Sequence, residues 1–480
     1  MRVAYTSTEV YPALKTGGLA DVNAALPRAL LDSGVDVRLL LPAFPAILRA
    51  AVDVQPVVQL DSPFGGVVAH ILRARLDGVT AYLIEAGGLF ERDGNPYVDA
   101  AGRDWPDNAL RFALLGWVAA RFADGAIDAW RPDIVHAHDW HAGLAPAYLA
   151  ARGGDRPGSV FTVHNLGFHG EFAAETFSQL ALPPHFFAMH GLEFYGKVNF
   201  MKAGLHYADR ITTVSPTYAR EILQPEFGFG MDGLLRSRAA VLSGILNGVD
   251  GAYWNPQTDP HIAAHFNSAD LAGKHACNAA LRRECGLTAS AGPLFGVVSR
   301  LTAQKGLDLL LDALPGLVAA GGQLVVLGSG DAALEQRWQA CAASHPGAVS
   351  VRIGYDEAFA HRIMAGSDVV LVPSRFEPCG LTQLYALAYG SLPLVRRVGG
   401  LADTVTDATA AARASASATG FVFDEASATA LGDALKRVFM LWREPKDWAR
   451  LIAAAMREDF GWAASARRYL ALYRELRPQA

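Results

Sequence analysis

The sequence has few cysteines and lacks the segments that direct a chain to export or to a membrane. Only Cys277, Cys285, Cys341 and Cys379 occur among 480 residues, and their spacing fits no metal-ligand motif. So few thiols suit a reducing cytoplasm better than a disulfide-stabilised secreted protein. The N-terminus has no apolar signal-peptide core, and no run of about 18 uncharged apolar residues indicates a membrane span. We therefore expect a soluble, unprocessed, cytoplasmic protein.

Clusters of basic charge are also scarce. The sequence has 42 Lys and Arg against 47 Asp and Glu, which gives a net charge of -5, and no Lys/Arg run is longer than a pair. Because nucleic acid binding depends on clustered positive charge, we do not expect a nucleic acid partner. Hydrophobic residues make up 51% and charged residues 19%, as in globular proteins. A chain of this length exceeds a single hydrophobic core, so two or three domains are expected.

Short apolar runs alternate with helical patterns in both halves of the chain, which predicts α/β domains with parallel sheets. The expected strands of the first half are 2–6, 35–41, 79–85, 134–137, 159–163 and 210–214. Those of the second half are 294–298, 323–327, 349–353, 368–372, 392–395 and 420–423. The fold class is therefore α/β, with two doubly wound, Rossmann-like domains.

The segment 244–250 contains an Asn-Gly turn and is the expected hinge. We accordingly assign 1–245 to the N-terminal domain, 246–455 to the C-terminal domain and 456–480 to a final helix. Trp462, Tyr469, Leu470 and Tyr473 form an apolar stripe at helical spacing on that last segment. This stripe is expected to pack back on the N-terminal domain.

Polar residues collect where the expected strands end, and ligands of open α/β sheets bind at the carboxyl ends of strands. The most informative segments are SRLTAQKG at 299–306 and SRFEPCGLT at 374–382. The first half contributes KTGG at 15–18, HDWH at 138–141 and HN at 164–165, and the second adds GSG at 328–330 and Gly354-Tyr355. The sequence GGLAD occurs at both 17–21 and 399–403, where paired glycines let backbone N–H groups approach an anion.

Each of these residues also has a purely structural interpretation. Asp139 suits a helix N-cap, His164 a hydrogen-bonded core histidine and Lys305 a solvated surface lysine. Glu377 suits an ion pair with Arg375. Because so many such residues fall at strand ends, a common site is the better interpretation.

The charges in these segments indicate the kind of ligand. Arg300 and Lys305 are suited to neutralise a diphosphate, Arg as a fork and Lys as a point charge. No Asp-x-Asp pair stands at a strand end to hold a divalent cation near it. We therefore expect a nucleoside diphosphate leaving group, with no metal and no other cofactor.

The motifs together resemble the bacterial glycogen synthase and plant starch synthase family, retaining glucosyltransferases of the GT-B fold. The resemblance covers nearly the whole chain. Besides the two segments at 299–306 and 374–382, it rests on KTGGLAD (15–21), HDW (138–140), FTVHN (161–165), FMKAG (200–204), ITTVSP (211–216), EFGFGMDGLL (226–235) and ILNGVD (245–250). It implies two Rossmann-like domains that face each other across a cleft. It also implies ADP-glucose as donor and an α-1,4-glucan, such as glycogen or a maltooligosaccharide, as acceptor.

The resemblance further implies a role for individual residues. Arg300 and Lys305 would hold the diphosphate, and Glu377 would contact the sugar hydroxyls. His164 would lie beside the reacting carbon, with Asp139 and Asn247 lining the sugar pocket. The remaining implied binding residues are Lys15, Gly18, Asp21 and Asn165 on the N-terminal side, Tyr355 over the base, and the turn of Cys379, Gly380, Leu381 and Thr382, whose N–H groups would face donor oxygens.

One position departs from the wider GT-B pattern. Many retaining relatives have a second Glu eight residues after the first, and here that position is Tyr385. The resemblance attributes this feature to the glycogen synthase subfamily. It favours front-face departure and attack over a covalent intermediate, with Asp139 as the remaining nucleophile candidate.

Three other functions compete with glucan synthesis. A sucrose or sucrose-phosphate synthase would share Arg300, Lys305 and Glu377, although KTGGL at 15–19 favours the glucan polymerase. A catalytically inactive glucan- or nucleotide-binding regulator is the alternative from a different class. A phosphorylase is disfavoured, because the chain is short and no lysine loop suggests pyridoxal phosphate.

Overall fold

The computed structural model describes residues 1–92 and 94–478, which divide into two compact units. Unit 1 comprises Met1–Gly248 and the residues from Trp462 onward, and unit 2 comprises Val249–Gly461. The chain therefore changes unit after residues 248 and 461 instead of 245 and 455. Local pairing explains the difference. The Ile245 N–H donates to the Thr213 carbonyl at 2.8 Å, and the Val249 N–H donates to the Phe460 carbonyl at 2.8 Å.

Unit 1 contains a nine-stranded sheet in the order β12-β11-β7-β6-β1-β2-β5-β4-β3. Its strands are β1 (Arg2–Thr6), β2 (Asp36–Pro42), β3 (Val52–Asp61), β4 (Val68–Leu76), β5 (Val79–Glu85), β6 (Ile134–His138), β7 (Gly158–Val163), β11 (Arg210–Thr213) and β12 (Leu242–Gly244). Seven of them, from β12 to β5 in spatial order, pair in parallel. The expected parallel strands of this half are thus confirmed to within a residue or two at their ends.

The sequence patterns missed the antiparallel strands of unit 1. Strands β3 and β4 form a hairpin that extends the sheet beyond β5, and β3 is largely exposed and includes Pro56. An exposed edge strand shows no apolar run, which explains the omission. A second small sheet contains β8 (Glu171–Phe172), β10 (Lys197–Asn199) and β9 (Glu193–Phe194), all too short for a sequence signal.

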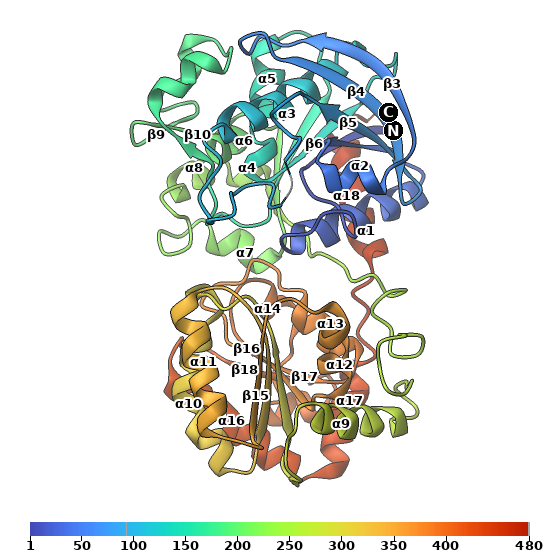
Figure 1. Ribbon diagram of the computed structural model, residues 1–480, viewed down its shortest axis with the longest axis vertical. Coiled ribbons are helices and arrows are strands. Elements are labelled where there is room, and N and C mark those ends of the chain that lie inside the picture. The colour runs from blue at the N-terminus through green and yellow to red at the C-terminus, as the bar shows by residue number, and fades with distance from the viewer. Residues whose placement is uncertain (93, 479–480) are drawn as a thin grey trace. The chain divides into compact units, whose positions relative to one another are not determined.

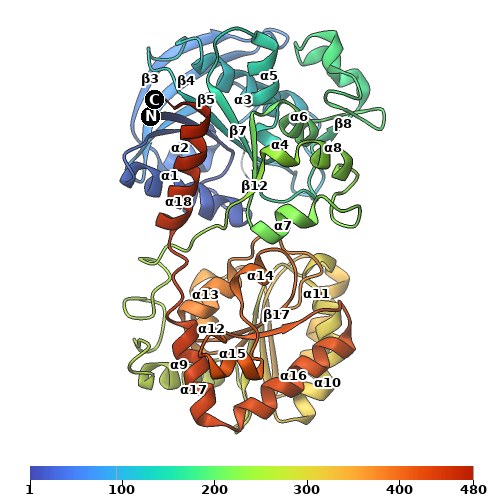
Figure 2. The ribbon, with the colours of Figure 1, turned by 180° about the vertical axis from the view of Figure 1, so that it is seen from behind.

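The helices of unit 1 lie on both faces of the large sheet (Figure 1). They are α1 (Gly18–Asp32), α2 (Pro45–Ala50), α3 (Asn108–Phe122), α4 (Asp139–Ala142), α5 (Leu144–Arg152), α6 (Phe200–Tyr207), α7 (Pro216–Glu221), α8 (Asp232–Ser237) and α18 (Trp462–Leu476). Helix α18, the last part of the chain, lies beside α1 (Figure 2). Its Trp462, Tyr469 and Tyr473 are buried, and the Tyr473 hydroxyl hydrogen-bonds His136 Nδ1 at 2.7 Å.

Unit 2 contains a six-stranded, fully parallel sheet in the order β15-β14-β13-β16-β17-β18. Its strands are β13 (Leu294–Val298), β14 (Gln323–Gly328), β15 (Val349–Ile353), β16 (Val369–Val372), β17 (Leu392–Arg396) and β18 (Phe421–Phe423). This is the strand order of a doubly wound Rossmann domain. All six correspond to expected strands.

Helices cover both faces of this second sheet. Helices α10 (Leu307–Ala319), α11 (Ala332–Ser344) and α16 (Ala428–Trp442) lie on one face (Figure 1). Helices α9 (Ala272–Glu284), α12 (Glu357–Gly366), α13 (Thr382–Ala388) and α17 (Pro445–Ala455) lie on the other. The short helices α14 (Gly399–Thr404) and α15 (Ala410–Ala414) complete the unit.

The strand order reverses once in the parallel part of each large sheet, between β1 and β6 in unit 1 and between β13 and β16 in unit 2. Connections leave in opposite directions at such a switch point, which opens a crevice at the carboxyl ends of the strands. Four of the segments predicted from the sequence to carry ligand-binding residues, 15–18, 138–141, 299–306 and 374–382, follow these four strands. His164 and Tyr355 follow β7 and β15 instead.

Candidate functional site

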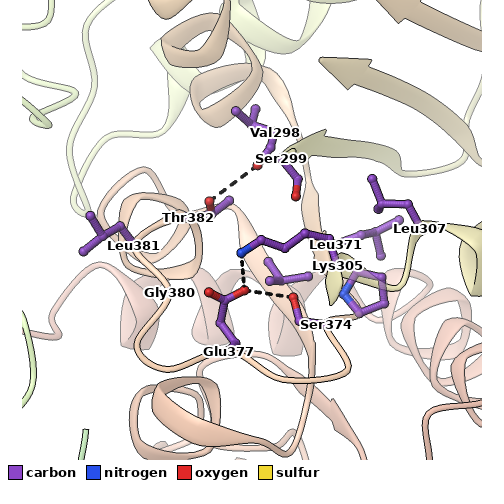
Figure 3. A pocket seen from close by; sticks show the side chains of 12 residues that line it. Val298, Ser299, Lys305, Leu307, Leu371, Ser374, Glu377, Gly380, Leu381 and Thr382 are labelled. Carbon is purple, nitrogen blue, oxygen red and sulfur yellow. Dashed lines mark hydrogen bonds and ion pairs between the residues drawn. The ribbon is translucent and has the colours of Figure 1, made fainter. Parts of the chain in front are cut away.

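A cavity of about 50 Å³ lies at the switch point of unit 2. It is lined by the ends of β13 and β16, by the loops that follow them and by the first residues of α10 and α13, and Figure 3 shows these side chains converging. The predicted site residues that line it are Lys305, Glu377, Gly380, Leu381 and Thr382. The structure therefore brings together residues that are more than 70 positions apart in the sequence.

Lys305 and Glu377 form an ion pair at this cavity. Lys305 Nζ lies 2.5 Å from Glu377 Oε2, and the Ser374 hydroxyl donates to the same oxygen at 2.9 Å (Figure 3). Glu377 is 6% exposed, so its carboxylate depends on these two donors. The structural interpretations of both residues are wrong: Lys305 is not a solvated surface lysine, and Glu377 does not pair with Arg375. Arg375 instead forms a bidentate ion pair with Asp308, with both contacts at 2.7 Å.

Two glycine positions shape this cavity through close backbone approaches. Gly306 has φ of +65°, and a Cβ placed on it would lie 2.0 Å from the Pro373 carbonyl oxygen. Gly399 has φ of +46°, and its Cβ would lie 1.9 Å from the Glu377 carbonyl oxygen. The Gly400 N–H donates to that same carbonyl at 3.1 Å. The sequence pattern predicted that N–H groups of the second GGLAD segment approach an anion. In the structure the Gly400 N–H instead holds the backbone of the Glu377 loop.

Other predicted residues of unit 2 lie outside the lining of the cavity. Arg300 is exposed on the loop after β13. Cys379 is buried, and its carbonyl accepts a hydrogen bond from Gln383 Nε2 at 3.0 Å. Tyr355 follows β15, is 72% exposed and hydrogen-bonds Glu357.

Asp139 occupies the carboxyl end of β6 in unit 1. Its φ is +54°, and its Oδ1 accepts the His164 N–H at 2.7 Å. The helix cap of α4 is His138, so the N-cap interpretation of Asp139 is wrong. Burial raises the pKa of Asp139 to about 7, against the lowering effect of the His164 and Asn165 N–H groups, and the Glu9 charge raises it further. A carboxyl group with such a pKa changes charge near neutral pH.

His164 lies beside Asp139 at the end of β7. Its Nε2 is 2.9 Å from His138 Nδ1, and the His138 ring stacks on Tyr5 at a centroid distance of 4.0 Å. Burial lowers the pKa of His164 to about 3 and the pKa of His138 well below its usual value. Both imidazoles are therefore neutral at pH 7 and share one hydrogen bond. His164 thus takes part in a hydrogen bond with another histidine, as its structural interpretation supposed, while it also lies at a strand end.

The loop after β1 is organised by Glu9, which is 2% exposed. Its carboxylate accepts the Thr16 N–H at 2.6 Å, the Thr16 hydroxyl at 2.7 Å and the Tyr97 hydroxyl at 2.5 Å. The sequence analysis missed Glu9 and Tyr97. A search for carboxylates just after each strand finds Glu9, which stands three residues beyond β1. Tyr97 lies in an irregular segment between β5 and α3 and has no comparable signal.

The loop that Glu9 fixes carries the other predicted residues of the first strand end. Lys15 Nζ lies 3.0 Å from Asp21 Oδ1. Gly18 is the first residue of α1, and Gly17 before it has open space within 4 Å of where a Cβ would stand. These N–H groups are thus accessible at the start of a 15-residue helix.

Two further predicted residues lie in unit 1. Asn165 Oδ1 accepts the Gly167 N–H at 2.9 Å, and Asn247 is 6% exposed just before the end of the first segment of unit 1.

Within residues 1–92 and 94–478, no group of three or more His, Cys, Asp or Glu is placed to hold a metal ion. In that same part of the chain, no helix is both long and apolar enough to cross a membrane.

Comparisons with known proteins give a consistent assignment. The family described as "Starch synthase catalytic domain" matches residues 2–237, and "Glycosyl transferases group 1" matches residues 286–454. A glycogen synthase of Yersinia pestis (strain Pestoides F) is 56% identical over 480 residues, covering 99% of this chain and all of the relative. The chain belongs to the glycogen synthase family. A family member from Serratia proteamaculans (strain 568) is 55% identical over 479 residues, again with 99% of this chain covered.

Solved structures agree with membership of the glycogen synthase family. The catalytic domain of starch synthase IV from Arabidopsis thaliana, bound to ADP and acarbose, matches with a TM-score of 0.90 and 32% identity over 99% of both chains. The chain is therefore a glycosyltransferase with the GT-B fold. A sucrose-phosphate synthase from Thermosynechococcus elongatus matches with a TM-score of 0.61 at 20% identity over the full length of both chains, which shows the shared fold alone.

Proposed function

We propose that this member of the glycogen synthase family transfers glucose from ADP-glucose to the non-reducing end of an α-1,4-glucan, with retention of configuration and without a metal ion. The observation that supports this best is the Lys305–Glu377 pair at the switch point of unit 2. A cation and a carboxylate at one cavity suit a donor that carries both a diphosphate and a sugar. The match to a starch synthase bound to ADP and acarbose supports a nucleotide-sugar donor and a glucan acceptor.

On the donor side, Lys305 and Arg300 neutralise the diphosphate while Glu377 accepts hydrogen bonds from sugar hydroxyls. A cation about 4 Å from a developing phosphate charge contributes roughly 4 kcal/mol at an effective dielectric near 20. Lys305 already points into the cavity because Glu377 holds its ammonium group, so little reorganisation is needed when donor arrives. The turn at Cys379, Gly380, Leu381 and Thr382 presents N–H groups to donor oxygens, and Tyr355 covers the base.

On the side of unit 1, Lys15 and the Gly18 N–H meet the donor, and Asp21 and Asn165 complete its binding. Asp139 and Asn247 line the sugar pocket. His164 is neutral at pH 7, so it acts beside the reacting carbon as a hydrogen-bonding group and not as a cation. Ionised Asp139 stabilises the positive charge that develops on the sugar in the transition state.

Retention follows from front-face departure and attack. The position eight residues after Glu377 is Tyr385, which stacks on Trp254 at a centroid distance of 3.8 Å and offers no carboxylate. The leaving phosphate then helps to deprotonate the acceptor hydroxyl on the same face. Asp139 remains the alternative as a nucleophile in a double displacement.

The experiment that tests the function is incubation with glycogen and labelled ADP-glucose or UDP-glucose, followed by counting of label in polymer. We expect incorporation from ADP-glucose at the higher rate. Incorporation from neither donor, together with confirmed ADP binding, would favour an inactive glucan- or nucleotide-binding regulator. In a parallel incubation with fructose or fructose phosphate in place of glycogen, transfer of label to the sugar would favour a sucrose-type synthase.

A further inference from the structure

A second hollow in unit 1 lies at the edge of the sheet opposite to the candidate site. It has a volume of about 640 Å³ and is lined by residues 154–158, 207–210, 238 and 476–477. Gly158 is the first residue of β7 and Arg210 the first of β11, whereas His164 follows the far end of β7. Six strand residues span roughly 17–20 Å. The hollow is therefore separate from the residues assigned to glucosyl transfer.

Four arginines and two aspartates line this hollow: Arg156, Arg210, Arg238, Arg477, Asp155 and Asp209. One aspartate is already committed to one arginine. Asp209 accepts two hydrogen bonds from Arg156 at 2.8 Å each, and it also accepts the Ser159 N–H and hydroxyl. This leaves an excess of positive charge in a chain whose net charge is -5.

Two of the other three guanidinium groups lie beyond hydrogen-bond distance of their acidic neighbours, and the third is held by backbone carbonyls. Arg210 lies 3.7 Å from Glu475 and Arg477 lies 3.7 Å from Asp155, both beyond hydrogen-bond distance. The Glu475 and Asp155 side chains are mostly exposed, so these two ion pairs contribute little to stability and hold the arginines only weakly. Arg238 donates to the carbonyls of His206 and Ala208, which fixes its guanidinium in the wall through neutral acceptors.

Arginine forks bind phosphate oxygens through paired, charge-assisted hydrogen bonds. A hollow of this volume lies within the range of small-molecule sites and is larger than a phosphate ion requires. We propose that this hollow binds a small phosphate monoester, with the phosphate group held by Arg210, Arg238 and Arg477.

Isothermal titration calorimetry with glucose 1-phosphate, and separately with inorganic phosphate, tests this site. The test variant is Arg210→Ala/Arg477→Ala. The control is Arg467→Ala/Arg468→Ala, which removes the same charge from exposed positions of α18 outside the hollow. We expect the test variant to weaken glucose 1-phosphate binding at least tenfold, and the control to bind as the wild type does. Glucosyl transfer measured without added phosphate should be unchanged in both variants.

The other outcomes overturn the proposal in distinguishable ways. If both double variants bind glucose 1-phosphate equally weakly, the loss of affinity comes from the lower net positive charge and not from a site in the hollow. Unchanged binding in the test variant would place the phosphate at the donor site, which Lys305→Ala would then abolish. Equal affinity for glucose 1-phosphate and inorganic phosphate would overturn the assignment to an ester and leave an adventitious ion only. Absence of any binding to the wild type would remove the site altogether.

Discussion

Lys305 Nζ lies 2.5 Å from Glu377 Oε2, although the two residues are 72 positions apart and follow different strands. Water has limited access to this ion pair, because the Lys305 side chain is 18% exposed and the Glu377 side chain 8%. We expect Lys305→Ala and Glu377→Ala each to lower kcat by at least about a hundredfold, because both groups act on charge that develops in the transition state. Arg300→Ala should behave alike. Steady-state kinetics with ADP-glucose and glycogen measures the effect, and near-wild-type turnover in either of the first two variants contradicts the proposed site.

The same pair predicts a non-additive effect on stability. Lys305→Ala leaves the buried Glu377 carboxylate with one donor fewer, which costs roughly 3 kcal/mol. The double variant Lys305→Ala/Glu377→Gln removes the uncompensated charge, so we expect it to be more stable than Lys305→Ala alone. Urea unfolding of the four proteins of the cycle measures the coupling. Strictly additive losses would show that the pair is energetically unimportant.

The buried carboxyl group of Asp139 is expected to lower the stability of the protein at high pH although glucosyl transfer requires it. Its pKa in the folded protein is about 7, above its ordinary value of 3.8, because burial disfavours the charged form. The folded state then binds more protons than the unfolded state between these two pKa values. The resulting contribution of Asp139 to the free energy of unfolding is complete below about pH 4 and is lost as pH rises through 7. Asp139→Asn should remove that loss and raise the melting temperature at pH 8 by a few degrees while abolishing transfer. A melting temperature unchanged or lowered at pH 8 would contradict the raised pKa.

Glu9 is expected to act as a positioning residue. Its charge is one cause of the raised pKa of Asp139, and its carboxylate fixes Thr16 beside Lys15. We expect kcat to rise with pH near pH 7 as Asp139 ionises. Glu9→Gln removes a negative charge that raises the pKa of Asp139, so we predict that this rise in kcat moves toward lower pH. Tyr97→Phe keeps the Glu9 charge and removes one of its donors, so it serves as the matched control and should leave the limb in place. An identical profile in all three proteins would limit Glu9 to a structural role.

Metal-independent catalysis follows from the proposed role of Arg300 and Lys305 as the diphosphate clamp. EDTA should leave the initial rate of glucosyl transfer largely unchanged. Loss of activity in EDTA, with recovery on addition of Mg²⁺ or Mn²⁺, would show that a metal ion neutralises the diphosphate instead. The measurement needs only the wild-type protein and the labelled donor.

The sequence predicted the parallel core well because buried parallel strands are short apolar runs between turn residues. Five of the six strands of unit 2 and the corresponding strands of unit 1 follow this rule, and strand ends carry Lys305, Glu377, Asp139 and His164. The edge strand β15 (VSVRI) is only partly buried. The exposed hairpin of β3 and β4 has no such run. It escaped prediction because its pairing depends on the neighbouring strand β5 and not on its own hydrophobicity.

Pairings between distant residues were the part that the sequence left open. Nothing in the pattern distinguishes Arg375 from Lys305 as the partner of Glu377, because both are cations on strand-end loops. A third side chain decides the choice, because the Asp308 carboxylate in the first turn of α10 pairs with Arg375. Tyr97 and the carboxylate of Glu9 likewise meet only after an irregular segment folds over the strand ends.

Gly306 links the backbone to the position of Lys305, which precedes it. Its φ is +65°, and an added Cβ would lie 2.0 Å from the Pro373 carbonyl oxygen. Gly306→Ala therefore combines backbone strain of about 1 kcal/mol with a collision that displaces one of the two loops. Gly321→Ala is the matched control, because Gly321 has φ of +87° but open space around its Cβ position. We expect Gly321→Ala to lose only about 1 kcal/mol of stability at full activity, and Gly306→Ala to lose more stability and at least about tenfold in kcat. Equal effects of the two substitutions on stability and turnover would show that the close approach of the loops does not position Lys305.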